Sequence, residues 1–113
     1  MQAIKLCFSL LVLFAAGCAH ANLVVSAHEA VNYIGKKATV CGYAAQLVAN
    51  KQYIFLNFDY SYPNQTFTVF ITPEASYNNI HQFEKRKVCA LGTVGLYKGK
   101  ADMTNPQSLQ IVN

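Results

Sequence analysis

Residues 66–72, TFTVFIT, alternate between two kinds of side chain along the whole segment. One side of an extended chain would carry only large apolar residues, Phe67, Val69 and Ile71, and the other side three threonines and Phe70. A period of two is typical of a β-strand that turns one face toward a hydrophobic core. Because this pattern cannot make the apolar stripe of a helix, it restricts the chain to folds whose core is supplied by a sheet.

The sequence predicts four further strands. Residues 38–48 are β-branched or small, and Gly42 inside this run predicts a bulge or a sharp bend. Residues 52–59 alternate before a predicted turn around Pro63 and Asn64. The pattern of strand residues returns at 87–97, and a last strand is expected at 101–104.

Two short helices are predicted outside these strands. Ser26 and Glu29 have the spacing of a capping box, in which each side chain bonds the other residue's backbone amide. Gly35 is suited to end that helix in the left-handed conformation. Residues 72–74, Thr-Pro-Glu, resemble the start of a second helix, with apolar residues at helical spacing up to Phe83.

The predicted order is therefore helix, three strands, helix, two strands. A mainly β chain with five strands and a helix between the third and fourth matches the OB-fold, a small Greek-key barrel. Residues 22–113 leave room for one such domain. A domain of this size buries only about 60–65% of its unfolded surface, so a covalent cross-link would help to stabilise it.

Cys41 and Cys89 fall on two strands that are neighbours in an OB-fold. Cys41 shares a face with Thr39, and Cys89 shares a face with Leu91, so both thiols can point the same way. Two cysteines in an exported protein are more often a disulfide than a metal site. We therefore expect a Cys41–Cys89 disulfide, and the alternative is two buried thiols.

The N-terminal residues predict export. Lys5 precedes an apolar run at 6–16, which is shorter than the roughly 20 residues that span a bilayer and suits a secretory signal. Residues 1–21 end in Ala-His-Ala, a fitting cleavage site, and we favour this cut. The overlapping residues 15–18, AAGC, resemble a lipobox, and in that alternative Cys18 is lipidated and anchors the protein to a membrane. Both alternatives predict a periplasmic, secreted or membrane-anchored location.

Four segments carry a family resemblance: AHEAVNYIGKKATVCG, FLNFDYSYPNQTFTVFI, KVCALGTVGLYKGKADM and NPQSLQI. They resemble the bacterial OB-fold domains found in small exported proteins and beside some nuclease domains. The similarity runs from about Ser26 to Ile111. The last segment departs from the family, which has a more compact Asp-Pro-Ser-Gln-Ile there. The resemblance implies an OB-fold whose general use is to bind nucleic acid, without catalysis.

An OB-fold that binds single strands combines rings that stack on bases with cations that contact phosphates. The usual surface is formed by the second and third strands and the loops beside them. We expect Tyr53, Phe55 and Phe70 to form the stacking platform. The other candidate residues are Tyr60, Tyr62 and Tyr97 in the adjoining loops and the cations Lys51, Lys98 and Lys100.

Each candidate has an alternative role. The rings can pack against the barrel, the N-terminal helix or a protein partner, and the lysines can be ordinary solvated residues of a hairpin. The expected ligand is single-stranded nucleic acid or an oligonucleotide. The alternative is a protein-interaction module of the cell envelope, which the compartment favours because little nucleic acid is found there. The chain shows no spacing typical of a catalytic triad, a carboxylate pair or a metal site, so we expect no enzyme activity, metal or cofactor.

Overall fold

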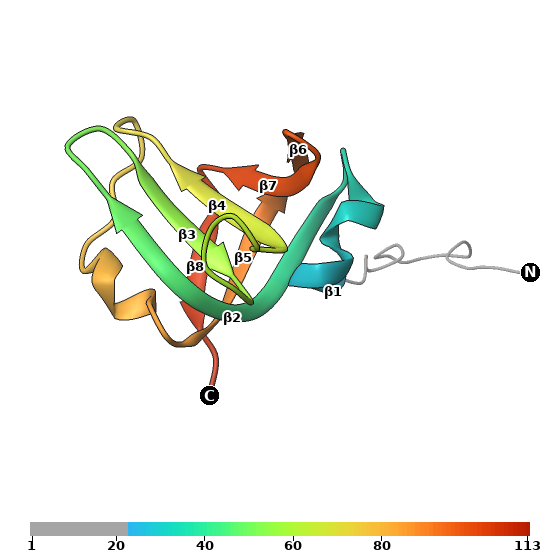
Figure 1. Cartoon of the computed structure of the whole chain (residues 1–113), viewed down its shortest axis with the longest axis horizontal. Helices are drawn as coiled ribbons and strands as arrows, with labels where there is room; N and C mark the ends of the chain where they lie inside the picture. Colours follow the sequence, from blue (N-terminus) through green and yellow to red (C-terminus); the bar gives the residue numbers. More distant parts are fainter. Residues whose placement is uncertain (1–22) are drawn as a thin grey trace, which may run out of the picture.

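A computed structural model describes residues 23–113 of the chain (Figure 1). The strands are β1 (Val24–Ser26), β2 (Lys37–Ala49), β3 (Ile54–Phe58), β4 (Phe67–Ile71), β5 (Lys87–Thr93), β6 (Gly95–Tyr97), β7 (Lys100–Thr104) and β8 (Ser108–Ile111). Two short 3-10 helices are η1 (Ala27–Tyr33) and η2 (Ile80–Phe83). The predicted signal segment, its cut after Ala21 and the alternative lipidation of Cys18 lie outside the described residues.

The strands form one sheet in the order β6-β7-β4-β3-β2-β5-β8, and β1 pairs with β2. The β4–β7 and β1–β2 pairs are parallel, and the other pairs are antiparallel. This confirms a mainly β fold. The prediction of a five-stranded Greek-key barrel is wrong in detail, because the structure has eight strands in residues 23–113 and the path of hydrogen-bonded neighbours does not return from β8 to β6.

The extra strands can each be traced to specific contacts. The predicted strand at 87–97 divides into β5 and β6 at Val94, which is buried. The backbone of Val94 exchanges hydrogen bonds with Gly35 and Lys36 instead of a sheet neighbour. Residues before η1 and after Pro106 add β1 and β8, which pair with β2 and β5.

β2 bends strongly and serves two parts of the sheet (Figure 1). Its first half pairs with β1 and β5, and its second half pairs with β3. The register with β3 shifts between Ala44 and Gln46, so the irregularity lies a few residues beyond the predicted position at Gly42. Gly42 instead permits close packing, because a Cβ there would lie 2.9 Å from the Ala27 Cβ.

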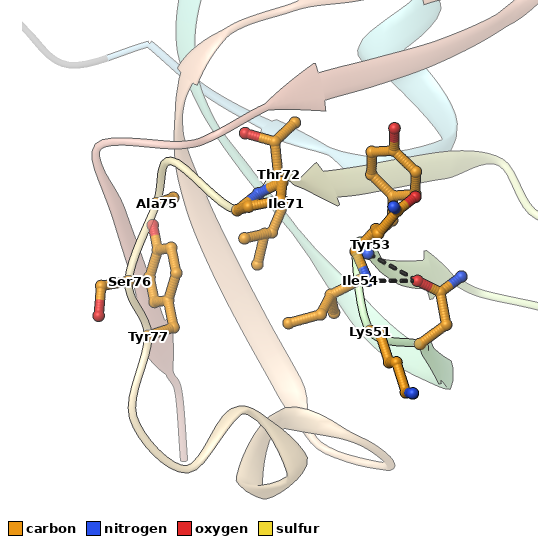
Figure 2. Close-up of a pocket in the computed structure, with 11 residues that line it drawn as sticks. Lys51, Tyr53, Ile54, Ile71, Thr72, Ala75, Ser76 and Tyr77 are labelled. Carbon is orange, nitrogen blue, oxygen red and sulfur yellow. Dashed lines mark hydrogen bonds between the residues drawn. The ribbon is translucent and has the colours of Figure 1, made fainter.

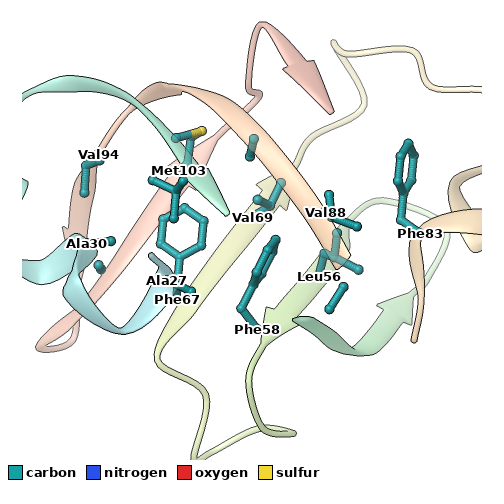
Figure 3. Packing of buried hydrophobic residues seen from close by; sticks show 14 of the residues in the cluster. Ala27, Ala30, Leu56, Phe58, Phe67, Val69, Phe83, Val88, Val94 and Met103 are labelled. Carbon is teal, nitrogen blue, oxygen red and sulfur yellow. The ribbon is translucent and has the colours of Figure 1, made fainter. Parts of the chain in front are cut away.

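The core lies against the inner faces of β3 and β4, as the alternation predicted (Figure 3). Leu56, Phe58, Phe67 and Val69 are fully buried. The rings of Phe58 and Phe67 meet edge to face, with their centroids 5.3 Å apart. Every buried hydrophobic residue that the structure describes lies within residues 25–103, so a chain without residues 1–21 keeps this whole core.

The helices differ from the sequence prediction. The Ser26 hydroxyl donates to the Glu29 carboxylate at 3.1 Å, and no side chain caps the backbone of η1, so the capping box is not formed. Gly35 has φ +86° and ends this turn as predicted. The second helix does not start at Thr72, because the Thr72 hydroxyl is engaged with Glu74 and Asn105. Only η2 is helical there, and neither described helix has the length and apolar content to cross a membrane.

The disulfide prediction is confirmed. Cys41 and Cys89 lie directly opposite each other in the antiparallel β2–β5 pair and are joined by a disulfide. The bond joins two cysteines that are 48 residues apart in sequence, and Cys41 precedes the register shift of β2 between Ala44 and Gln46. Among residues 23–113, no group of three His, Cys, Asp or Glu side chains could hold a metal ion.

Candidate ligand-binding face

Three rings lie together on the outer face of β3 and β4. Phe55 and Phe70 are cross-strand partners, with ring centroids 5.0 Å apart. Tyr53, just before β3, stacks on Phe70 at 5.3 Å and an interplanar angle of 27°. Phe55 and Phe70 are half-buried, whereas 39% of Tyr53 is exposed. We call Tyr53, Phe55 and Phe70 the aromatic cluster, and its most accessible ring is Tyr53.

The turn between β2 and β3 places Tyr53 at this position. The Asn50 side-chain oxygen accepts hydrogen bonds from the backbone amides of Gln52 and Tyr53, at 2.7 and 2.8 Å (Figure 2). The backbone of Asn50 donates to the Tyr53 carbonyl at 2.9 Å. This arrangement fixes the start of β3, and with it the side on which the Tyr53 ring emerges.

A pocket of about 230 Å³ lies beside Tyr53. The β2–β3 turn and Ile54 form one side, Ile71 and Thr72 lie behind, and the segment that carries Tyr77 forms the other side (Figure 2). The Tyr77 hydroxyl donates to the Pro106 carbonyl at 2.6 Å, and burial raises the pKa of Tyr77. The sequence prediction assigned Tyr77 to a helix face and so missed its place in this wall.

A row of polar side chains crosses the same sheet face next to the aromatic cluster. The Asn57 amide donates to the Gln46 side-chain oxygen at 2.9 Å, and the Thr68 hydroxyl donates to the Asn57 side-chain oxygen at 2.9 Å. Thr68 is paired in register with Asp102 of β7. We call Gln46, Asn57, Thr68 and Asp102 the polar row. None of the four was predicted as a site residue, because their contact depends on the register of four strands.

Two members of the polar row are unusual for a sheet surface. Only 3% of Asn57 is exposed, and the backbone amide of Tyr62 donates to Gln46, so the β3–β4 loop folds back toward β2. Asp102 is half-buried, and this burial raises the pKa of its carboxyl. No residue among 23–113 forms a hydrogen bond or ion pair with that carboxylate. The outer face therefore combines apolar rings with an accessible, unpaired acceptor.

The remaining candidate rings lie in loops near the other end of the face. Tyr60 and Tyr62 are well exposed in the β3–β4 loop, where Asn64 donates to the Ser61 carbonyl and confirms the predicted turn. Tyr97 ends β6 and is also exposed. These rings do not join the aromatic cluster in any ring contact that the structure shows for residues 23–113.

The three candidate lysines have different surroundings. Lys98 stands in the β6–β7 turn with its ammonium 5.4 Å from the centroid of the Tyr97 ring. The Lys100 ammonium donates to the Gln65 carbonyl at 2.9 Å, so it holds the hairpin to the β3–β4 loop. Lys51 lines the pocket at the opposite end of β3 and β4. The cations therefore flank the face at both ends, and Lys100 has a structural contact.

Comparison with known proteins yields similar structures only. No protein-family model matches the chain, and no curated protein matches it. The structure of OBody AM1L10 bound to hen egg-white lysozyme has a TM-score of 0.61 and 16% identity, over 85% of this chain and 99% of that one. The fold is OB-like. This confirms the predicted fold in its coarse form.

Two tRNA synthetases are also similar to the chain. A putative aspartyl-tRNA synthetase from Leishmania major Friedlin has a TM-score of 0.62 and 8% identity, over 91% of this chain and 23% of that one. Asparaginyl-tRNA synthetase from Pyrococcus horikoshii has a TM-score of 0.52 and 16% identity, over 73% of this chain and 21% of that one. The chain thus matches only about a fifth to a quarter of each synthetase, and such low identity shows the fold alone.

Proposed function

We propose that this chain is an exported OB-fold binding module whose outer β3–β4 face binds single-stranded nucleic acid. The aromatic cluster is the observation that carries the proposal. Tyr53, Phe55 and Phe70 form a continuous ring surface beside an open pocket. Unpaired bases can stack on such rings, at roughly 1–3 kcal/mol per base. Bases in a duplex are already stacked on each other, so we expect duplexes to bind less well.

The charges support a strand that runs along the face. Lys51 lies at the pocket end and Lys98 in the hairpin at the other end, so phosphates can be contacted at both limits of the ring surface. The similar structures agree with this use in a general way, because two of them belong to enzymes named for tRNA. The synthetase activity itself is not proposed for this chain.

Export is supported by the N-terminal sequence and by the disulfide, since disulfides persist mainly in oxidising compartments. We propose cleavage after Ala21, with lipidation of Cys18 as the alternative. The mass of the exported protein distinguishes them, because the first predicts an unmodified chain that begins at Asn22. A cytoplasmic chain that keeps Met1 would contradict both.

A protein partner is the second candidate function. It is favoured by the exposed apolar and aromatic residues outside the aromatic cluster, which include Tyr60, Tyr62, Leu96 and Tyr97. It is also supported by the similar OBody structure, which is a complex with the protein lysozyme. In this alternative, the loops rather than the ring surface would make the main contacts.

Fluorescence anisotropy of residues 22–113 with labelled single-stranded and duplex oligonucleotides tests the proposal. We expect micromolar or tighter binding of the single strand, which weakens as salt is added because counterions are released from phosphates. Tyr53→Ala should weaken binding at least fivefold, whereas Tyr43→Ala, an exposed tyrosine away from the cluster, should not. If no strand binds even at low salt, the nucleic-acid function is wrong and the protein partner takes its place.

A further inference from the structure

A backbone amide fixes the direction of hydrogen bonding along the polar row. The amide of Tyr62 can only donate, so the Gln46 atom that it contacts at 2.9 Å must be the side-chain oxygen. The Asn57 group that faces this same oxygen must then be its NH₂, which donates at 2.9 Å. The orientation of both amides therefore follows from one backbone group.

The same logic determines the state of Thr68. Since the Asn57 NH₂ faces Gln46, the Asn57 oxygen faces Thr68 and accepts the Thr68 hydroxyl hydrogen at 2.9 Å. A hydroxyl has a single hydrogen to donate, so Thr68 has none left for Asp102. The remaining lone pairs of Thr68 can only accept. An ionised carboxylate also only accepts.

The Asp102 carboxylate lies close to the β6 backbone. Asp102 is the register partner of Thr68 on one side and of Gly95 on the other. A Cβ at Gly95 would lie 2.6 Å from the Asp102 Oδ1, so only glycine leaves room for the carboxylate in this position. The Asp102–Thr68 end of the polar row thus presents several acceptors and no side-chain donor on the proposed binding face.

A ligand that fits this end must supply two or more donors. Among the nucleobases, guanine carries two adjacent donors on its pairing edge, the N1–H and the N2 amino group, and a carboxylate can accept both together. Thymine and uracil carry one donor between two carbonyl oxygens, and adenine and cytosine carry an amino donor beside a ring-nitrogen acceptor, so each of these bases would set an acceptor against the acceptors of this end. We propose that Asp102, with Thr68 beside it, selects guanine in a bound single strand. This inference rests on the proposed function.

Binding of eight-nucleotide strands to residues 22–113 tests the inference. The probes are all-thymine, the same strand with one central guanine, and the same strand with inosine in place of guanine, which lacks the N2 amino group. We expect the guanine strand to bind roughly five- to a hundredfold more tightly than the all-thymine strand, the range for a good bidentate contact to a base. The inosine strand should fall between them.

Two variants separate the carboxylate's chemistry from its position. Asp102→Asn has the same shape but adds donors, and it should remove the preference for guanine over thymine. Gly95→Ala keeps every charge but displaces the carboxylate, and it should reduce the same preference. Circular dichroism and urea denaturation establish whether each variant is folded. One variant changes the chemistry of the carboxylate and the other changes its position, so either variant that folds can test the inference.

The outcomes distinguish this inference from the proposed function. Equal binding of all three strands by the wild type, or an unchanged guanine preference in Asp102→Asn, overturns the inference and leaves the proposed function intact. Binding of no strand overturns the proposed function. Asp102-dependent binding of an arginine peptide, with no strand bound, would overturn both and support a protein partner, because a guanidinium also presents paired donors.

Discussion

Gly42 lies where η1 crosses β2, and its missing side chain is what permits this contact. An added Cβ would lie 2.9 Å from the Ala27 Cβ and 3.1 Å from the Phe58 ring. Ala27 and Phe58 are buried, so neither can move aside easily. We expect Gly42→Ala to lower the free energy of unfolding by about 1–3 kcal/mol, as other overpacked cores do.

Urea denaturation measures this loss, and Gly99→Ala is a useful comparison. Gly99 has φ +81° and open space around it, so that variant should lose stability through backbone strain alone, about 1–2 kcal/mol. In Gly42→Ala the clash should also weaken the packing of η1. A Gly42→Ala protein as stable as the wild type would show that η1 does not pack this closely.

Asp102 gives a second prediction at the residue scale. Burial raises its pKa above the ordinary value of 3.8, so the folded protein holds the proton more tightly than the unfolded chain. Burying the ionised carboxylate destabilises the folded protein. This loss of stability is absent below the unfolded pKa and becomes complete as the pH rises through the raised folded pKa. The stability of wild type relative to Asp102→Asn should therefore fall as the pH rises from below the ordinary value of 3.8 through the raised folded pKa.

Denaturation of both proteins across this pH range checks the sign. The other carboxyls titrate in both proteins, so the difference in free energy of unfolding isolates Asp102 as long as the distant sites are independent. A difference that stays constant with pH would mean that Asp102 titrates normally. A difference that moves in favour of the wild type would indicate that a cation or donor approaches the carboxylate in solution.

At the element scale, the disulfide holds β2 against β5. Cross-links act largely on the unfolded chain, and a loop of 48 residues predicts about 4 kcal/mol in the chain-entropy description. Replacing both Cys41 and Cys89 by alanine should therefore lower the free energy of unfolding by roughly 3–4 kcal/mol. Reduction of the wild type should reproduce this loss. A variant within 1 kcal/mol of the oxidised protein would contradict the stabilising role of the bond.

The β6–β7 hairpin gives a prediction that separates two neighbouring lysines. Lys100→Met removes the hydrogen bond to the Gln65 carbonyl and should cost about 0.5–1.5 kcal/mol of stability. Lys98→Met should change stability by less than about 0.5 kcal/mol, but it should reduce the salt dependence of oligonucleotide binding by about one phosphate contact. Denaturation and salt titration of the two variants measure these effects. Interchanged results would mean that the contacts assigned to the two ammonium groups are wrong.

The strands that sequence alone predicted are those with strong local signals. The alternation at 66–72, the turn before it and the facing cysteines all depend on residues near one another in sequence or on a simple strand order. The prediction of a helix that begins at Thr72 was wrong because Thr72 instead forms hydrogen bonds with the Asn105 side chain, which is distant in sequence. Division of the strand at Val94 likewise depends on hydrogen bonds to Gly35 and Lys36.

In the molecule as a whole, some parts of the candidate site follow from local sequence and others depend on contacts between distant strands. The aromatic cluster was predictable, because Phe55 and Phe70 alternate outward from two adjacent strands. The polar row and the pocket were not, because β2, β3, β4 and β7 must all be in register before Gln46, Asn57 and Asp102 lie near Thr68. Sequence also could not show that the predicted lysines would lie at opposite ends of the face.

Amide chemical shifts test whether the outer β3–β4 face is the binding surface. They are recorded on ¹⁵N-labelled residues 22–113 while a single-stranded eight-nucleotide strand is added. We expect the largest changes at Tyr53, Phe55, Phe70 and Thr68, with little change in η1. Binding that leaves these amides unchanged and instead perturbs the exposed β6 edge or η1 would contradict this expectation.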